Sequence, residues 1–227
     1  MSEENTEVST EEVDQTQTRA QNHLLIEREQ YLSHGVHIGT KLKTKHTQNW
    51  IYRTTSYGLF VININATDAR LRIAAKFLAK FDPKKILICS IRRYGRKPVA
   101  AFAEVVGAVA KNRRFIPGTL TNPMIDDYFE ADVIIIIDPH ADKQALQEAR
   151  LARIPVVALI DTDDVLNTIE VAIPTNNRGR KALSLIMYLL ARQIQREKGA
   201  IPADGDISVP KEDFESKIMP KRDTKPK

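Results

Sequence analysis

Near-continuous apolar runs, separated by segments of helical periodicity, are the feature that most constrains this chain. The long runs are GLFVININ (58–65), KILICS (85–90), DVIIIID (132–138) and IPVVALID (154–161), and the shorter run IEVAIP (169–174) is typical of an edge strand. Strands that are apolar at nearly every residue are covered on both faces, as in a parallel sheet. The alternation therefore predicts an α/β fold with a doubly wound parallel sheet and helices on both faces.

Four segments between or after these runs have the 3.6-residue period of helices. The first follows a cap at Thr67, and the second opens at Pro98 and turns its apolar residues, Val109 among them, inward. The third is DKQALQEARLA (142–152). The last, GRKALSLIMYLLARQIQ (179–195), is the most apolar and is predicted to pack deepest.

Composition divides the chain into a folded body and two tails. The first 18 residues contain six acidic residues and no basic one, and they lack apolar periodicity. The residues after Gly199 collect prolines and scattered charges and end in KIMPKRDTKPK. We predict a disordered acidic tail over 1–19, a single α/β domain over 20–197 and a flexible C-terminal tail over 198–227.

Charge and cysteine content narrow the class of partner. The formal net charge is +5, but without the acidic first 18 residues it rises to +11, which favours a polyanionic partner. A single cysteine, Cys89, excludes an internal disulfide and indicates a reducing compartment. No apolar run is long enough to span a membrane, and the N-terminal residues lack the apolar block of a signal peptide. We expect a cytoplasmic protein with no membrane partner.

Three short basic segments lie next to predicted turns or helix starts: RRYGRK (92–97), KNRR (111–114) and RGRK (178–181). A fourth, KLKTKH (41–46), lies in a region without clear periodicity. Arginine and lysine suit phosphate oxygens, and tyrosines among them can stack on unpaired bases. Each segment alone is typical of a solvated surface, but several in one small domain favour nucleic-acid binding. The predicted RNA-binding residues are Arg92, Arg93, Tyr94, Arg96, Lys97, Arg113, Arg114, Arg178, Arg180, Lys181, Lys41, Lys43 and Lys45.

The segment VVALIDTDDVL offers a rival hypothesis, a magnesium-dependent phosphohydrolase. Its Asp161 and Asp163 resemble the nucleophile and the general acid/base of haloacid-dehalogenase-like enzymes. Only 66 residues follow Asp161, however, so the other residues that such an enzyme needs have no scaffold. The simpler interpretation is that these carboxylates cap a turn, as Asp142 in DPHAD caps a helix. We expect no catalytic residue and no metal site made by the protein alone.

Several segments, taken in order, resemble one known family. They are YLSHGVHIGT, NWIY with GLFVININ, CSIRRYGRKPV, NRRFIPGTLTNP, DVIIIIDPHADKQALQEARLARIPVVALIDTDD and IPTNNRGRKALSLIMYLLARQ. The resemblance is to the second protein of the small ribosomal subunit, whose eukaryotic relative is ribosomal protein SA, the laminin-receptor precursor. Only MIDDYFEA stands where the bacterial form carries a helical hairpin, which indicates the archaeal–eukaryotic branch.

This resemblance implies a flavodoxin-like (Rossmann-like) sheet, no catalysis and no small-molecule substrate. It implies a structural constituent of the small ribosomal subunit that binds rRNA near the head–body junction, touches neighbouring ribosomal proteins and supports assembly and translation. It implies no cofactor, apart from a magnesium ion that the protein would share with rRNA. The acidic turns at 138–142 and 161–164 would face a basic neighbour or such an ion. A third hypothesis, a surface adhesion protein, rests only on the name of the eukaryotic relative.

Overall fold

The computed structural model describes residues 24–202 and 204–217, so the predicted acidic tail lies outside the described residues. Its centre is a five-stranded, all-parallel sheet in the order β4-β3-β5-β6-β7. The strands are β3 (Ile86–Cys89), β4 (Val109–Lys111), β5 (Val133–Ile136), β6 (Val156–Ile160) and β7 (Val171–Pro174). This is the flavodoxin-like order, in which the first strand lies between the second and the third. The predicted fold class is confirmed.

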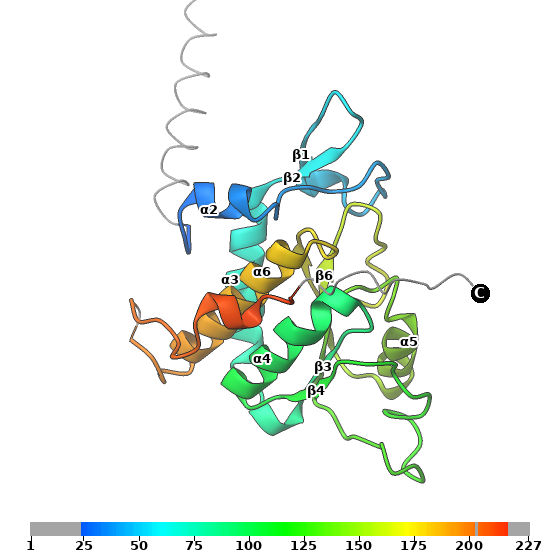
Figure 1. Ribbon diagram of the computed structural model, residues 1–227. Helices are drawn as coiled ribbons and strands as arrows, with labels where there is room; N and C mark the ends of the chain where they lie inside the picture. The colour runs from blue at the N-terminus through cyan, green and yellow to red at the C-terminus, as the bar shows by residue number, and fades with distance from the viewer. Residues whose placement is uncertain (1–23, 203, 218–227) are drawn as a thin grey trace, which may run out of the picture.

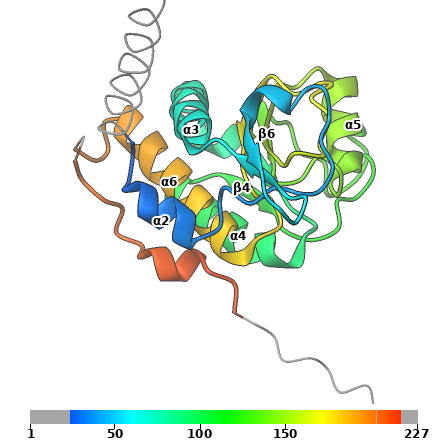
Figure 2. The same cartoon turned by 90° about the horizontal axis from the view of Figure 1, so that it is seen from above.

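Helices cover both faces of the sheet (Figures 1 and 2). Helices α3 (Ile64–Leu78), α4 (Arg96–Val106) and α6 (Arg180–Glu197) pack together on one face, and α5 (Lys143–Ala152) lies on the other. Strand side chains alternate between the two cores: Ile135 belongs to the core under α3, α4 and α6, and Ile134 and Ile136 to the core that contains α5. Covering by helices on both sides explains why β5 and β6 are apolar at every residue.

Helix α6 is the most deeply buried helix of the described residues, as its composition predicts. Residues from Ala182 to Ile194 are buried on almost every side, because α6 contacts both α3 and α4. No helix within residues 24–202 and 204–217 has both the length and the apolar character that crossing a membrane requires.

The run 58–65 is not a strand of the parallel sheet, and that expectation is wrong. Its residues form β2 (Phe60–Ile62), which pairs antiparallel with β1 (Ile51–Thr54) in a separate hairpin. Gly58, at φ +77°, lies in the turn between these strands, a conformation that favours glycine. Residue 38 bridges the other side of β2. Strand β1 is largely exposed, so it lacks the apolar pattern that reveals the buried strands.

Two helix boundaries also differ from expectation. Helix α3 begins at Ile64, where the Asn63 side chain accepts the backbone N–H of Asn65 at 3.0 Å. Thr67 is therefore not the cap, and its hydroxyl donates to the Pro174 carbonyl of β7 at 2.7 Å. Helix α4 opens at Arg96, two residues before the predicted Pro98.

Helix α4 also ends earlier than its apolar period suggests. Gly107 has φ +84° and closes the helix, with its N–H and that of Ala108 both donating to the Ala103 carbonyl. Val109 consequently lies in edge strand β4, not on the helix. The apolar period of the sequence continues past Gly107, but the helix ends at this glycine.

Residues 204–217 do not behave as the free tail that their composition predicts. They run back across α4 and α6 as a segment that we call the strap, which includes the short 3-10 helix η4 (Lys211–Phe214). Phe214 is fully buried and packs edge-on against Tyr188, with ring centroids 5.7 Å apart. The predicted domain end near residue 197 is thus too early, because an apolar side chain anchors the following segment.

Candidate nucleic-acid interface

The parallel sheet brings the four basic segments together at the carboxyl ends of its strands, which we call the carboxyl edge. RRYGRK follows β3, KNRR begins at the end of β4, and RGRK follows β7. The segment 41–46 reaches the same edge because it is hydrogen-bonded to the turn after β6. The strands are parallel, so all four segments lie at the carboxyl ends of the strands, where open α/β sheets bind their ligands.

The point where the strand order reverses, between β3 and β5, is occupied by an ion pair of the chain itself. Asp138, fully buried after β5, accepts the backbone N–H groups of His140 and Ala141 at 2.9 and 3.1 Å. The same carboxylate accepts Nε of Arg92, which follows β3. Arg92 therefore fastens its loop to the neighbouring strand, while its contact with RNA stays a prediction.

The RRYGRK segment forms the short 3-10 helix η3 (Arg93–Gly95) and the start of α4, and most of its remaining cations are exposed. Asp142 accepts the Ile91 N–H at 2.8 Å, which fixes the start of the loop. A Cβ at position 95 would lie 2.2 Å from Oγ of Ser90 and 3.1 Å from its Cβ, so any residue other than glycine would force the Ser90 side chain to move. Arg93, Tyr94 and Arg96 are exposed, and Lys97 is half-buried.

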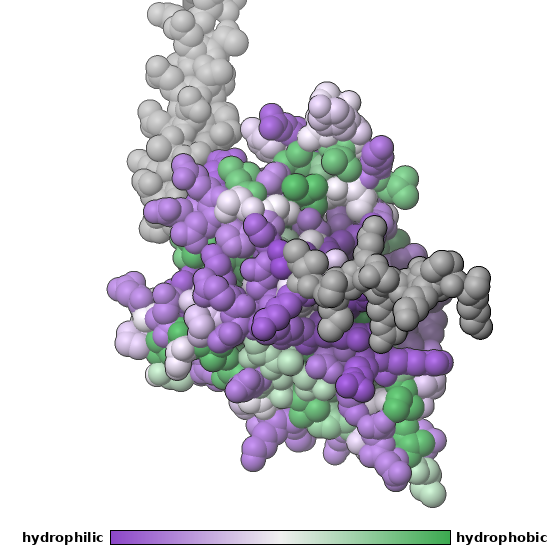
Figure 3. Space-filling model, in the orientation of Figure 1, coloured by the Kyte–Doolittle hydropathy of each residue, from purple (hydrophilic) through white to green (hydrophobic). Residues whose placement is uncertain are grey.

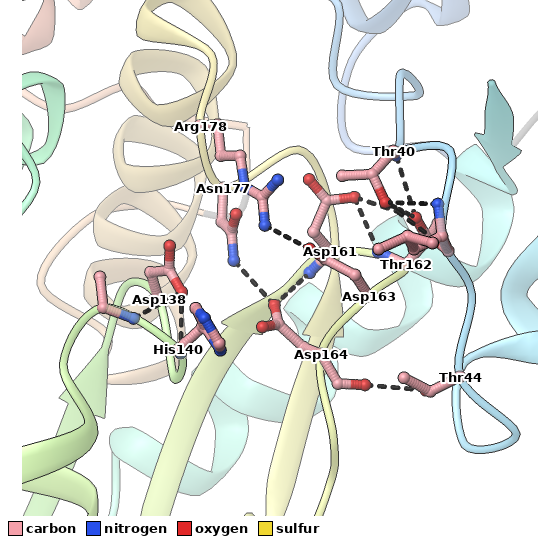
Figure 4. Close-up of polar contacts among 12 residues, drawn as sticks. Thr40, Thr44, Asp138, His140, Asp161, Thr162, Asp163, Asp164, Asn177 and Arg178 are labelled. Carbon is pink, nitrogen blue, oxygen red and sulfur yellow. Dashed lines mark hydrogen bonds and ion pairs between the residues drawn. The ribbon is translucent and has the colours of Figure 1, made fainter.

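The RGRK segment forms the start of α6, and its two arginines are ion-paired. The Asn176 side chain accepts the N–H groups of Arg178 and Gly179 at 3.0 and 2.8 Å and shapes the turn. Arg178 donates to Asp163 at 2.5 Å (Figure 4). Arg180 contacts Glu215 of the strap at 3.0 Å. Lys181 is exposed.

Composition did not reveal the strap's part in this edge. Besides the contact of Glu215, Arg180 donates to the Ser216 carbonyl at 3.1 Å, and the Ser216 hydroxyl donates to the Tyr94 carbonyl at 2.9 Å. The strap thus joins the loop after β3 to the start of α6. The one sequence signal that points to it is Phe214, an aromatic residue within a charged stretch.

Three threonines hold the lysine-bearing segment 41–46, and two of them, Thr40 and Thr44, are labelled in Figure 4. The Thr44 hydroxyl donates to the Asp164 carbonyl at 2.8 Å, the Thr47 hydroxyl to the Thr162 carbonyl at 2.6 Å, and the Thr40 hydroxyl meets that of Thr162 at 2.9 Å. This anchoring leaves Lys41, Lys43 and Lys45 exposed. Lys43 additionally lies over the Phe60 ring, 5.3 Å from its centroid.

Arg113 and Arg114 are exposed after β4, beside a surface hollow of about 260 Å³. Lys111 lines this hollow and pairs with Asp127 at 2.8 Å. The loop beyond is held by buried Glu148, which accepts the N–H groups of Gly118 and Leu120. Arg113 and Arg114 form no ion pair with any described residue, and they lie next to the loop that Glu148 holds.

The carboxylates after β6 close a turn, as the simpler interpretation predicts (Figure 4). Asp164 accepts the Asp161 N–H at 2.7 Å and the Asn177 side-chain amide at 2.9 Å. Asp161 accepts the N–H of Thr162 at 2.7 Å. Burial raises the pKa of Asp161 and of Asp164 from 3.8 to about 6, despite these hydrogen bonds. Both carboxylates are thus integral to the fold of the edge.

The acidic turns do not form the exposed acidic surface that we expected. Asp138, Asp142, Asp161 and Asp164 are buried, so they do not meet a neighbouring protein, and only Asp163 is partly exposed. Asp163, the second carboxylate of the supposed phosphohydrolase, is paired with Arg178. Within the described part of the chain, no three His, Cys, Asp or Glu side chains are placed to hold a metal ion. The geometry gives the phosphohydrolase hypothesis no support.

Comparisons with known proteins give the family of this chain. The family model described as ribosomal protein S2 matches residues 31–130 and 124–197. The archaeal relatives named "Small ribosomal subunit protein uS2" include those of Staphylothermus marinus and Saccharolobus solfataricus. The Staphylothermus marinus relative is 46% identical over 96% of this chain and 99% of its own length. The Saccharolobus solfataricus relative is 46% identical over 94% of this chain and 93% of its own length. The relative from Thermofilum pendens is also 46% identical, over 86% of this chain and 92% of its own. The chain therefore belongs to the ribosomal protein S2 family, in its archaeal form, whose members are structural proteins of the small ribosomal subunit and not enzymes.

Proposed function

We propose that this chain, a constituent of the small ribosomal subunit in the cytoplasm, grips small-subunit rRNA near the head–body junction with the exposed cations of its carboxyl edge. The observation that carries the proposal is the gathering of four basic segments at one edge of a parallel sheet. Phosphate contacts from several loops fix both the position and the orientation of a protein on RNA. Neighbouring ribosomal proteins complete its surroundings.

The predicted residues divide into two roles. Arg92, Arg178 and Arg180 are bound to carboxylates and act mainly by holding the loops in place. The cations without an ion pair among the described residues would meet the phosphates directly: Arg93, Arg96, Lys97, Arg113, Arg114, Lys181, Lys41, Lys43 and Lys45. Tyr94, exposed between two arginines, would lie against a base or a sugar.

A charge-matched comparison tests the edge. The variant Arg93→Ala, Arg96→Ala, Lys181→Ala removes three exposed cations from it, and these side chains make no ion pair within the described residues. Each lost phosphate contact lowers the slope of log K against log salt by about 0.9 for a duplex, so the triple variant should reduce it by about 3. Filter binding to small-subunit rRNA measures this slope, and sucrose-gradient sedimentation measures incorporation into the subunit.

The control removes three exposed lysines near the opposite edge, Lys76, Lys80 and Lys84, which lie at the end of α3 and before β3. It changes the net charge by the same amount and should leave the slope almost unchanged. If both variants lower affinity equally, net charge and not the carboxyl edge governs binding.

A further inference from the structure

A second pocket lies outside the sheet edge, between α2 (Arg28–Ser33), the β1–β2 hairpin and the start of α3. We call it the hairpin pocket. It has a volume of about 180 Å³ and is lined by Arg28, Leu32, His37, Tyr52, Arg53 and Asn63, among others. Figure 3 shows apolar surface gathered over the hairpin, above a mostly hydrophilic face. The segment that carries Lys41, Lys43 and Lys45 leads into β1 of this hairpin, so the chain connects the pocket directly to the proposed interface.

The mouth of the hairpin pocket is positively charged. Arg28 comes from α2 and Arg53 from β1, and neither forms an ion pair with any described residue. The 15-residue helix α3 starts at the pocket with Asn63 as its cap, which adds the positive end of its dipole. Two arginines that converge on a helix start suit an anionic group, and phosphate best matches their forked donors.

The inner wall suits a flat, polar-edged ring. Tyr52 is 62% exposed and Leu32 43% exposed, although both line the pocket. His37 also lines the pocket, although its Nδ1, which has no hydrogen-bond partner, is itself shielded from solvent. Burial and the nearby Arg53 lower the pKa of His37, which favours the neutral imidazole, a ring with one donor and one acceptor. An aromatic face beside a second ring with polar edges is how proteins hold single bases.

We infer that the hairpin pocket binds one unpaired nucleotide of the small-subunit rRNA, with its phosphate on Arg28 and Arg53 and its base on Tyr52 and His37. The inference rests on the proposed function and adds a base-reading site to an interface in which every proposed contact except that of Tyr94 is to phosphate. An acidic side chain of a neighbouring protein would use the two arginines alone. It would leave the exposed Tyr52 and Leu32 without a role.

Nucleotide-resolution probing of protein-free small-subunit rRNA, with the full chain added, tests this. We expect the wild-type chain to protect one or two unpaired nucleotides from 2′-hydroxyl acylation and Tyr52→Ala to lose that protection selectively. The loss of a base–aromatic stack should weaken binding about 5- to 100-fold. Arg53→Gln should weaken the same protection. The matched control is Tyr57→Ala, which removes an 83% exposed tyrosine in the hairpin turn that does not line the pocket.

The outcomes separate the pocket from the wider proposal. Loss of the same nucleotide's protection in Tyr52→Ala and Arg53→Gln, with Tyr57→Ala unchanged, supports the inference. If wild type and Tyr52→Ala give identical protection while salt-dependent rRNA binding persists, the hairpin pocket holds no nucleotide. If both pocket variants fail only in assembly with other ribosomal proteins, the occupant is a protein side chain and the inference is overturned. Absence of any rRNA binding by the wild type would instead overturn the proposed function.

Discussion

Single residues at the carboxyl edge show how a charged surface is kept in shape. Buried carboxylates accept the backbone N–H groups of the loops, as Asp142 does for Ile91 and Asp164 for Asp161. Burial raises the pKa of these two carboxyls to about 6, because an ion loses hydration inside the protein. Each carboxyl thus holds a loop in place, and burial makes its charged form less stable than it would be in water.

The pH dependence of stability should report this cost at Asp142. Its folded pKa, about 6, lies above its ordinary value of 3.8, so the folded state holds the proton more tightly between these values. Its contribution to stability is present at low pH and is lost as pH rises through 6. Asp142→Asn keeps the acceptor for Ile91 and removes the titration. Relative to wild type, the variant should therefore gain about 2 kcal/mol of unfolding free energy between about pH 4.5 and about pH 7.5.

Urea unfolding of both proteins at the two pH values measures the difference. Asp138 and Arg92 also face this carboxyl, the first raising its pKa and the second lowering it, and both are retained in the variant. Parallel pH profiles for the two proteins would show that Asp142 does not titrate in this range.

At the scale of elements, the strap is the piece that sequence patterns miss. It connects the loop after β3 to the start of α6 through Ser216 and Glu215, and Phe214 anchors it between the helices. The sheet strands other than β4 are recognisable because their residues are buried on both faces and are therefore apolar throughout. Strand β1, edge strand β4 and the strap are recognised only in the fold, since their short segments are partly exposed and have no period of their own.

Phe214→Ala should therefore destabilise the chain more than any change on the outer side of the strap. Truncation of a fully buried phenylalanine leaves a cavity and typically costs about 3 kcal/mol or more. Denaturant unfolding measures this cost, and hydrogen exchange over 211–217 should accelerate. Glu212→Ala, at an exposed position of η4, is the control and should change stability little. Equal stability of the two variants would mean that Phe214 is not the anchor.

At the scale of the whole molecule, the strand topology decides where the exposed cations of this basic protein lie. Parallel strands place the ends of β3, β4, β6 and β7 together, so loops that are far apart in the sequence form one positive edge. The charge of such an edge acts jointly on a polyanion, through release of its counterions.

Salt dependence tests the edge as a unit. If six to ten of its cations contact duplex phosphates, affinity for small-subunit rRNA should fall about 10³- to 10⁵-fold between about 50 and 200 mM salt. Binding isotherms at several salt concentrations give the slope. A salt-insensitive affinity would contradict a grip made mainly of phosphate contacts.

The amino-acid sequence by itself determined the α/β class, the buried strands and helices, and the four basic segments, because burial and periodicity are local properties of a chain. Only the tertiary structure decided which cations are available. Arg92, Arg178 and Arg180 find Asp138, Asp163 and Glu215 across the fold, whereas Arg93, Arg96 and Lys181 remain exposed. Such pairings depend on which loops the folded sheet brings within reach of one another. No local sequence pattern encodes the distance between a cation and its carboxylate partner in the fold.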